Sequence, residues 1–256
     1  AAADEGIIFR RVDIAGAEPV KALYANVVDT RNCTCLADTS GNKISTIEHL
    51  MAALSVMKID NVVAEVTAPE MPIMDGAAAT FFEALRQAGT VKQSAPRRYL
   101  KILKSVRFAD DKGNYVLLEP ADKFSVYFEI EFPSKIVGHQ VFDAVITPEL
   151  FAEEIAPCRT FCEKTQIDYL RSIGLIKGGS LDNAVVLDGE TILNPTGFKV
   201  PKECVNHKVL DALGDMYTAG LPLIGRLTAH KTGHYHNNQL LKALFADKTN
   251  YEIIEE

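Results

Sequence analysis

Lys92-Gln-Ser-Ala-Pro-Arg-Arg98 is a polar, proline-containing stretch without helical or strand periodicity, and it separates two halves of the 256-residue chain. Such a composition is typical of linkers between domains. Each half is predicted to contain short strands followed by helices. Runs of strands followed by runs of helices indicate an α+β chain rather than a doubly wound one. We therefore expect two α+β domains, residues 1–95 and residues 96–256.

The hydrophobic pattern predicts the individual elements on both sides of this linker. The first half is predicted to have strands at 7–10, 22–28 and 61–67 and helices at about 45–57 and 77–87. Ser45 and Glu48 have the spacing of a capping box, which predicts that they cap the first of these helices. The second half is predicted to have strands near 99–108, 114–119, 124–132, 141–147 and 183–187, and helices at 148–156, 166–173, 203–219 and after Asn237.

Composition and charge restrict the class of protein. The 27 basic and 34 acidic residues give a net charge of −7, which argues against nucleic acid as a partner. No apolar run approaches the roughly 20 residues of a transmembrane segment, so we expect a soluble protein. Residues 1–6 lack a secretory signal, and the absence of an initiator Met suggests a processed chain or one that starts inside a longer protein.

The five cysteines are too few and too dispersed for a disulfide framework, which favours a reducing, cytoplasmic environment. The pairs Cys33/Cys35 and Cys158/Cys162 could contribute to a metal site, but their spacings differ from those of zinc fingers and ribbons. We interpret most cysteines as small buried apolar side chains.

One histidine and two aspartates share one face of the long helix predicted at 203–219. His207 and Asp211 are four residues apart, the spacing at which one helix can offer two metal ligands, and Asp215 continues this face. The alternative is a surface histidine with carboxylate neighbours.

Glu48-His49 would complete such a site, with His49 as the third ligand and a fourth position left open, as in catalytic zinc centres. Glu48 would be the base that takes a proton from the attacking water, unless it only caps its helix. Three of the six histidines lie at 230, 234 and 236, and His234, which follows a glycine, is our candidate for the acid.

Seven blocks of sequence, in order, resemble the UDP-3-O-acyl-N-acetylglucosamine deacetylases, the zinc amidases of lipid A biosynthesis in Gram-negative bacteria. The blocks are Ser45-Thr-Ile-Glu-His-Leu-Met-Ala-Ala-Leu54, Ile59-Asp-Asn61, Pro69-Glu-Met-Pro-Ile-Met-Asp-Gly76, Arg159-Thr-Phe161, Gly178-Gly-Ser-Leu-Asp182, His207-Lys-Val-Leu-Asp-Ala-Leu-Gly-Asp215, and Lys231-Thr-Gly-His234 with Asn237-Asn238. The resemblance implies two similar α+β domains, each layering a sheet with helices, with the active site between them.

The resemblance also implies roles for individual residues. One Zn²⁺ per chain would be held by His49, His207 and Asp211. The proposed catalytic residues are Glu48 as base, His234 as acid, Asp215 as the carboxylate that orients His234, and Thr160 as a donor to the oxyanion.

The substrate implied by the resemblance is an acylated UDP-amino sugar, from which the enzyme releases acetate. Lys208 matches a substrate-contacting lysine, and Lys231 is a further candidate contact to the diphosphate. An element at about 161–188 would form the passage for the acyl chain, with Phe161, Ile167, Ile176 and Ser180 as its candidate residues.

The chain departs from this family at two places. A strand and a His-Thr-Gly loop that usually precede the segment like Gly6–Arg10 are missing, so we expect an incomplete first sheet. Tyr235-His236 replaces residues that are usually small or apolar, which leaves open a supporting role for His236 if this segment is extended.

Two alternatives to a deacetylase follow from these observations. One is a metal amidohydrolase of the same fold with a different acyl-amide substrate, and the other is a catalytically silent binding or regulatory relative. The tail 250–256 is a candidate handle for a regulatory protease.

Overall fold

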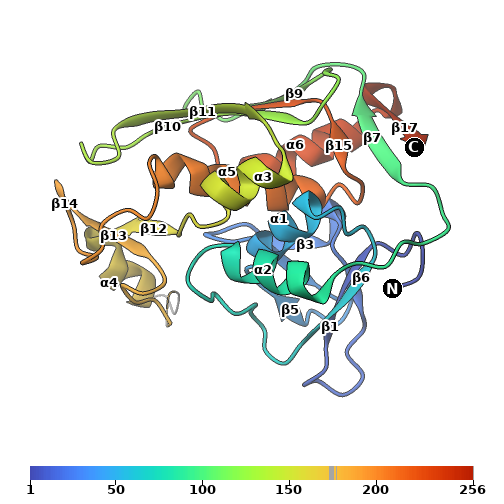
Figure 1. Ribbon diagram of the computed structural model, residues 1–256, viewed down its shortest axis with the longest axis horizontal. Coiled ribbons are helices and arrows are strands. Elements are labelled where there is room, and N and C mark those ends of the chain that lie inside the picture. Colours follow the sequence, from blue (N-terminus) through green and yellow to red (C-terminus); the bar gives the residue numbers. More distant parts are fainter. Residues whose placement is uncertain (173–175, 177, 256) are drawn as a thin grey trace.

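Two helices form the centre of the computed structural model, which describes residues 1–172, 176 and 178–255. Helix α1 (Glu48–Val56) packs beside helix α5 (Glu203–Tyr217), as Figure 1 shows. Every residue of α5 except Lys208 is buried. A Cβ atom on Gly214 would lie 2.0 Å from the backbone oxygen of Glu48, so this close approach of the two backbones requires glycine.

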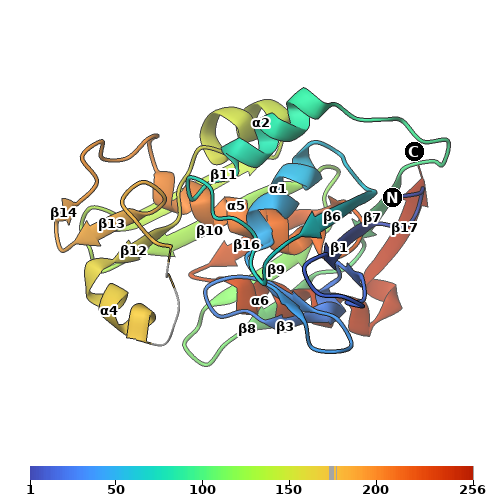
Figure 2. The ribbon, with the colours of Figure 1, turned by 90° about the horizontal axis from the view of Figure 1, so that it is seen from below.

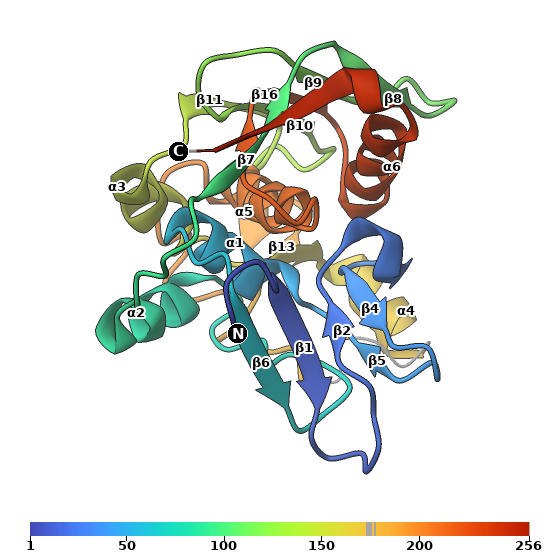
Figure 3. The same ribbon diagram turned by 90° about the vertical axis from the view of Figure 1, so that its right-hand side faces the viewer.

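A five-stranded sheet covers one side of the central helices (Figure 3). Its order is β11 (His139–Val145), β10 (Ser125–Glu131), β16 (Arg226–His230), β9 (Tyr115–Glu119) and β8 (Val106–Ala109). Strands β10 and β16 are parallel, and the other neighbours are antiparallel. Helix α5 contacts β10 and β11, while α6 (His234–Ala246) contacts β8 and β9, so both helices lie on the same face of the sheet.

Two small sheets from the first half of the chain lie on the other side of α1 (Figure 3). One has the order β2 (Val20–Lys21), β1 (Ile7–Arg11) and β6 (Val62–Val66), and the other consists of β3 (Val27–Asp29), β4 (Cys35–Ala37) and β5 (Lys43–Ile44). Helix α2 (Ala79–Ala88) packs against α1. The helices are thus layered between sheets from the two halves.

Two further three-stranded sheets lie at opposite ends of the molecule (Figure 2). One pairs β15 (Leu223–Ile224), β7 (Arg98–Ile102) and β17 (Tyr251–Glu255), near both termini. The other pairs β12 (Phe161–Glu163), β13 (Val185–Asp188) and β14 (Thr191–Ile192) beside α4 (Lys164–Ser172). Helix α3 (Pro148–Leu150) continues into a π-helical turn, Phe151–Ile155, that packs on α5.

The buried apolar side chains form two clusters. The smaller one lies around β1, β6 and α1 and includes Phe9, Leu36 and Tyr217. The larger one is built on the five-stranded sheet, α5 and α6, and also includes Ala52 of α1. The expected α+β fold is confirmed, while the boundary between residues 95 and 96 remains a prediction. Within the described residues, no helix has both the length and the apolar character needed to cross a membrane.

Several local predictions were wrong because contacts distant in sequence decided the outcome. Residues 22–28 are not one strand: the N–H of Tyr24 donates to the backbone oxygen of Thr218, and a 3-10 turn separates β2 from β3. The expected strand 99–108 is two strands, β7 and β8, in different sheets. Helix α6 begins at His234 rather than after Asn237. Residue 173 of the helix expected at 166–173 lies outside the described residues.

Candidate metal centre and catalytic site

Three buried side chains converge between α1 and α5. His207 and Asp211 lie one turn apart on α5, and His49 approaches them from the first turn of α1. One potential ligand atom from each lies within 4.8 Å of the other two. The Nε2 atoms of His49 and His207 are 3.7 and 3.4 Å from the same oxygen, Oδ1 of Asp211. This trio is the single His/Cys/Asp/Glu cluster of ligand geometry found among the described residues.

The protonation of His207 suits a metal ligand. Its Nδ1 lies 3.0 Å from the backbone oxygen of Cys158, so Nδ1–H donates there and Nε2 keeps its lone pair. Burial lowers the pKa of His207 to about 4, which leaves the ring neutral at neutral pH despite the nearby Asp211. The buried Nδ1 of His49 has no hydrogen-bond partner in the described part of the chain. Two imidazoles and a carboxylate form a donor set that fits a divalent transition metal.

Asp211 is held in its ionised form. Burial opposes ionisation, but the charges of its neighbours, among them His207 and Lys208, hold the pKa of this carboxyl well below its usual range. His207 is neutral at neutral pH, so at that pH we assign the stabilising positive charge to Lys208. The Nζ of Lys208 lies 2.9 Å from Oδ2 of Asp211. The ammonium group also lies 5.9 Å from the centroid of the Phe161 ring, and that ring is 6.4 Å from the His207 ring. Lys208 and Phe161 therefore flank the centre on one side.

Glu48 precedes His49 in the first turn of α1, and its carboxylate is buried beside the centre. Its Oε2 accepts a hydrogen bond of 3.0 Å from the backbone N–H of Thr34. Burial raises the pKa of Glu48, an effect that His234 and His49 oppose. The capping-box prediction was wrong: Ser45 bonds to the backbone of Pro69, and no side chain caps α1. Glu48 is thus directed into the site rather than back along the chain.

His234, the first residue of α6, forms a buried pair with Asp215 of α5. Its Nδ1 lies 2.8 Å from Oδ2 of Asp215, and its Nε2 faces Asp211 at 4.0 Å. Burial lowers the pKa of His234, but the Asp215 carboxylate outweighs this effect and raises it to about 9. The ring is therefore protonated at neutral pH. Its second N–H faces Asp211, so it can act as a proton donor within the centre.

The other two clustered histidines lie elsewhere. His236 is on α6, and its Nε2 bonds to Oδ2 of Asp110 at 3.2 Å while its ring packs against Phe108. The segment is helical rather than extended, so His236 points away from His234. His230 bonds to Glu129 on the five-stranded sheet. Neither ring reaches the centre.

Thr160 lies in a loop that is anchored to both halves of the molecule. Its N–H donates to the backbone oxygen of Gly76, and its own oxygen accepts from the N–H of Val185. The preceding residue, Arg159, forms a buried ion pair of 2.9 Å with Glu203 at the start of α5. Cys158, which receives the His207 hydrogen bond, belongs to the same loop. The loop thus holds the backbone of Thr160 in place two residues after Cys158, and the role of Thr160 as an oxyanion donor stays a prediction.

The structure does not bring every expected substrate residue to the centre. Lys231 forms an ion pair with Glu131 at the end of β10. Ile167, on α4, and Ile176 are partly exposed, and Ser180 is exposed. All three belong to the β12–α4–β13 region, which projects at one end of the molecule (Figures 1 and 2). Part of the expected passage, 161–188, lies outside the described residues.

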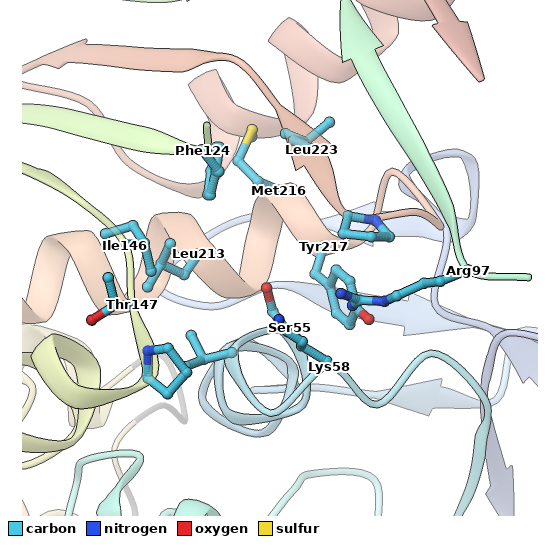
Figure 4. Close-up of a pocket in the computed structure, with 13 residues that line it drawn as sticks. Ser55, Lys58, Arg97, Phe124, Ile146, Thr147, Leu213, Met216, Tyr217 and Leu223 are labelled. Carbon is cyan, nitrogen blue, oxygen red and sulfur yellow. The ribbon is translucent and has the colours of Figure 1, made fainter. Parts of the chain in front are cut away.

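A separate cavity of about 120 Å³ lies at the C-terminal ends of α1 and α5 (Figure 4). Its wall is mainly apolar, with Phe124, Leu213 and Met216 among the lining side chains, while Arg97 lies at one side. Arg97 is already paired with Asp60. The lining of this cavity includes none of the histidine or carboxylate groups of the centre.

The sequence-based site was incomplete in two respects. Thr34 bonds through its hydroxyl to Asp215 at 2.6 Å, and Asn237 bonds through its amide to the same carboxylate at 2.8 Å. Asn237 stood in a recognised block without an assigned role, whereas Thr34 had only the two flanking cysteines to mark it. Those cysteines take no part in the metal group, and all five cysteines are free thiols.

Comparison with known proteins adds an independent finding. A sequence model of the family described as UDP-3-O-acyl N-acetylglycosamine deacetylase matches residues 1–246. A UDP-3-O-acyl-N-acetylglucosamine deacetylase of Phenylobacterium zucineum is 46% identical, over 96% of this chain and 84% of that protein. Proteins of the same name from Vibrio parahaemolyticus and Shewanella oneidensis are 45% and 44% identical, over 98% and 97% of this chain and 83% and 82% of theirs. The range matched by the family model, residues 1–246, contains the whole centre.

Proposed function

The chain belongs to the UDP-3-O-acyl N-acetylglycosamine deacetylase family, and from this premise we propose that it hydrolyses the N-acetyl group of UDP-3-O-acyl-N-acetylglucosamine. The products are acetate and the free amine, and the reaction belongs to lipid A biosynthesis. The convergence of His49, His207 and Asp211 beside Glu48 and the His234–Asp215 pair carries this proposal.

We propose zinc as the metal, held by His49, His207 and Asp211. A bound Zn²⁺ would polarise the amide carbonyl and lower the pKa of the attacking water. Two imidazoles and one carboxylate leave a fourth position for substrate or water, as catalytic zinc sites require. The neutral His207 and the ionised Asp211 present the lone pairs that such binding needs.

Glu48 acts as the general base. Its buried carboxylate is oriented by the Thr34 N–H and lies next to the ligand His49, so it can accept the proton of the attacking water. Burial raises its pKa and therefore its basicity.

His234 acts as the general acid. Asp215 keeps its imidazole protonated and fixes Nδ1, so Nε2 donates its proton to the leaving nitrogen. This step is needed because an amine anion is a very poor leaving group. Thr160, in the loop beside the centre, donates to the oxyanion, and the partly exposed Lys208 contacts the substrate.

The acyl chain is bound by the β12–α4–β13 region. Phe161 connects this region to the centre, because its ring packs near both His207 and Lys208. Ile167 and Ile176 leave part of their apolar surface exposed, and Ser180 lies beyond them. Lys231 is a diphosphate contact only if its ion pair with Glu131 opens on binding.

We place the enzyme in the cytoplasm, where its five free thiols would stay reduced. Control by a protease is compatible with the fold under one condition. Strand β17, which pairs with β7, must separate before a protease could engage residues 250–255.

Acetate release from the acylated and the unacylated UDP-amino sugar tests the substrate assignment. At roughly 0.8 kcal/mol per buried methylene, loss of the acyl chain should lower kcat/KM by several orders of magnitude. Equal rates on the two substrates would favour an amidohydrolase with another substrate, and no turnover of either by the zinc-loaded protein would indicate a silent relative.

A further inference from the structure

Thr34 makes two separate hydrogen bonds to the catalytic groups. Its backbone N–H donates to Oε2 of Glu48 at 3.0 Å, and its hydroxyl donates to Oδ1 of Asp215 at 2.6 Å. The hydroxyl also lies 3.5 Å from Nδ1 of His234. Only 3% of Thr34 is exposed, so water cannot replace these contacts easily.

These bonds connect elements that are far apart in sequence. Thr34 immediately precedes β4 and lies in the first half of the chain, whereas Asp215 is 181 residues away on α5. Glu48 begins α1. A single residue thus joins the proposed base to the carboxylate that orients the proposed acid.

The carboxylate of Asp215 receives donors on both oxygens. Oδ2 accepts from Asn237 and from Nδ1 of His234, both at 2.8 Å, and Oδ1 accepts from Thr34. The Thr34 bond therefore prevents rotation of the carboxylate about its Cβ–Cγ bond, and this rotation would turn Oδ2 away from His234. Without the hydroxyl, Oδ1 would be a buried carboxylate oxygen that lacks its donor.

We propose that Thr34 is a positioning residue that holds Glu48 and the Asp215–His234 pair in one catalytic geometry. The inference rests on the proposed function, because it assigns Glu48 as base and His234 as acid. Thr34 acts through these two residues and needs no contact with substrate. Its hydroxyl is the part that a substitution can remove, while the backbone N–H to Glu48 remains.

The main test compares Thr34→Val, which keeps the shape and removes the hydroxyl, with Thr34→Ser, which keeps the hydroxyl. In zinc-loaded enzyme we expect Thr34→Val to lower kcat by about 10- to 100-fold, the usual scale for a hydrogen bond to a charged group, with KM changed less than about threefold. Thr34→Ser should stay within about threefold of the wild type. Equal losses in both variants would show that retaining the hydroxyl does not rescue turnover, and this would overturn the proposal.

A double-mutant cycle with Asp215→Asn separates positioning from general stability. If Thr34 acts through Asp215, then Thr34→Val should cost less than about threefold in kcat when Asp215 is already replaced. The same loss in both backgrounds would contradict the inference. If Thr34→Val does not retain its zinc, Thr34→Ala takes its place in the cycle, with the same expectations.

Thr218→Val is the matched control. Thr218 is as buried as Thr34, at 2% exposure, but its hydroxyl donates to a backbone oxygen, that of Asp215. We expect its kcat to remain within about threefold of the wild type. If the wild-type enzyme shows no deacetylase activity, the proposed function fails; if the wild type is active and Thr34→Val matches it, only the inference about Thr34 fails.

Discussion

Two groups of histidines and a carboxylate lie in different parts of this molecule. In the centre, His49 and His207 direct their Nε2 atoms at the same oxygen of Asp211, at 3.7 and 3.4 Å. These distances exceed the usual hydrogen-bond length of about 2.9 Å, so the three groups face a shared point without closing on one another.

The second group lies on the five-stranded sheet. His139 and His230 bond to different oxygens of Glu129, at 2.8 and 3.0 Å. The side chain of His139 is 57% exposed, whereas those of the central group are at most 5% exposed. Two histidines and a carboxylate thus form a partly exposed hydrogen-bonded cluster in one place and a buried, convergent set of potential ligands in the other. Burial and a shared target atom, rather than composition, distinguish the candidate site.

The largest expected effect follows from removing the metal ligands. His49→Ala/His207→Ala should abolish zinc binding and lower turnover by about a thousandfold or more. His139→Ala/His230→Ala should keep one zinc per chain and turnover within about twofold. Metal analysis and acetate release on purified protein measure both. Stoichiometric zinc in the first variant would exclude the assigned ligands.

Replacement of the base should separate catalysis from metal binding. Glu48→Gln should lower kcat by about a hundredfold or more while zinc remains bound, because the amide cannot accept the proton of water. Glu129→Gln, in the second group on the five-stranded sheet, should leave kcat nearly unchanged. Wild-type turnover by Glu48→Gln would refute the role of Glu48 as base.

Loss of the proposed acid, His234, should lower kcat more than loss of His236, its neighbour on α6. His234→Ala should lower kcat by about a hundredfold, and His236→Ala by less than about tenfold, with zinc content measured in both. His236 bonds to Asp110, so its loss should mainly affect stability. The reverse order of kcat values would move the acid to His236.

The smallest effect is a change in pH dependence. His234 must be protonated to act as acid, so activity should fall as the pH rises through its pKa, which Asp215 raises to about 9. Asp215→Asn removes the negative charge that raises this pKa, while burial still lowers it. The alkaline limb of the kcat profile should therefore move to lower pH. An unchanged limb would show that another group controls it.

Local sequence patterns predicted a large part of this fold. The predicted helices include α2 and α5 within two residues and α1 within three, and the strands predicted near 114–119 and 124–132 match β9 and β10 within one residue. Strands β16 and β17 were missed, because their hydrogen bonds go to β9, β10 and β7, which lie far away in sequence. A short strand is stable only with its partner, so its own residues carry a weak signal.

The sequence by itself determined the chemical inventory: two ligands one turn apart on a helix, an adjacent Glu-His pair, and a histidine after a glycine. These follow from helix periodicity and from side-chain chemistry, which act over a few residues. The tertiary structure alone decided how they are used. In the folded chain Glu48 does not cap α1 but is a buried carboxylate, and His236 points away from His234. Thr34 bonds to Asp215, which is 181 residues away in sequence. Such contacts depend on how α1, α5 and α6 pack, and packing is a property of the whole chain rather than of any segment.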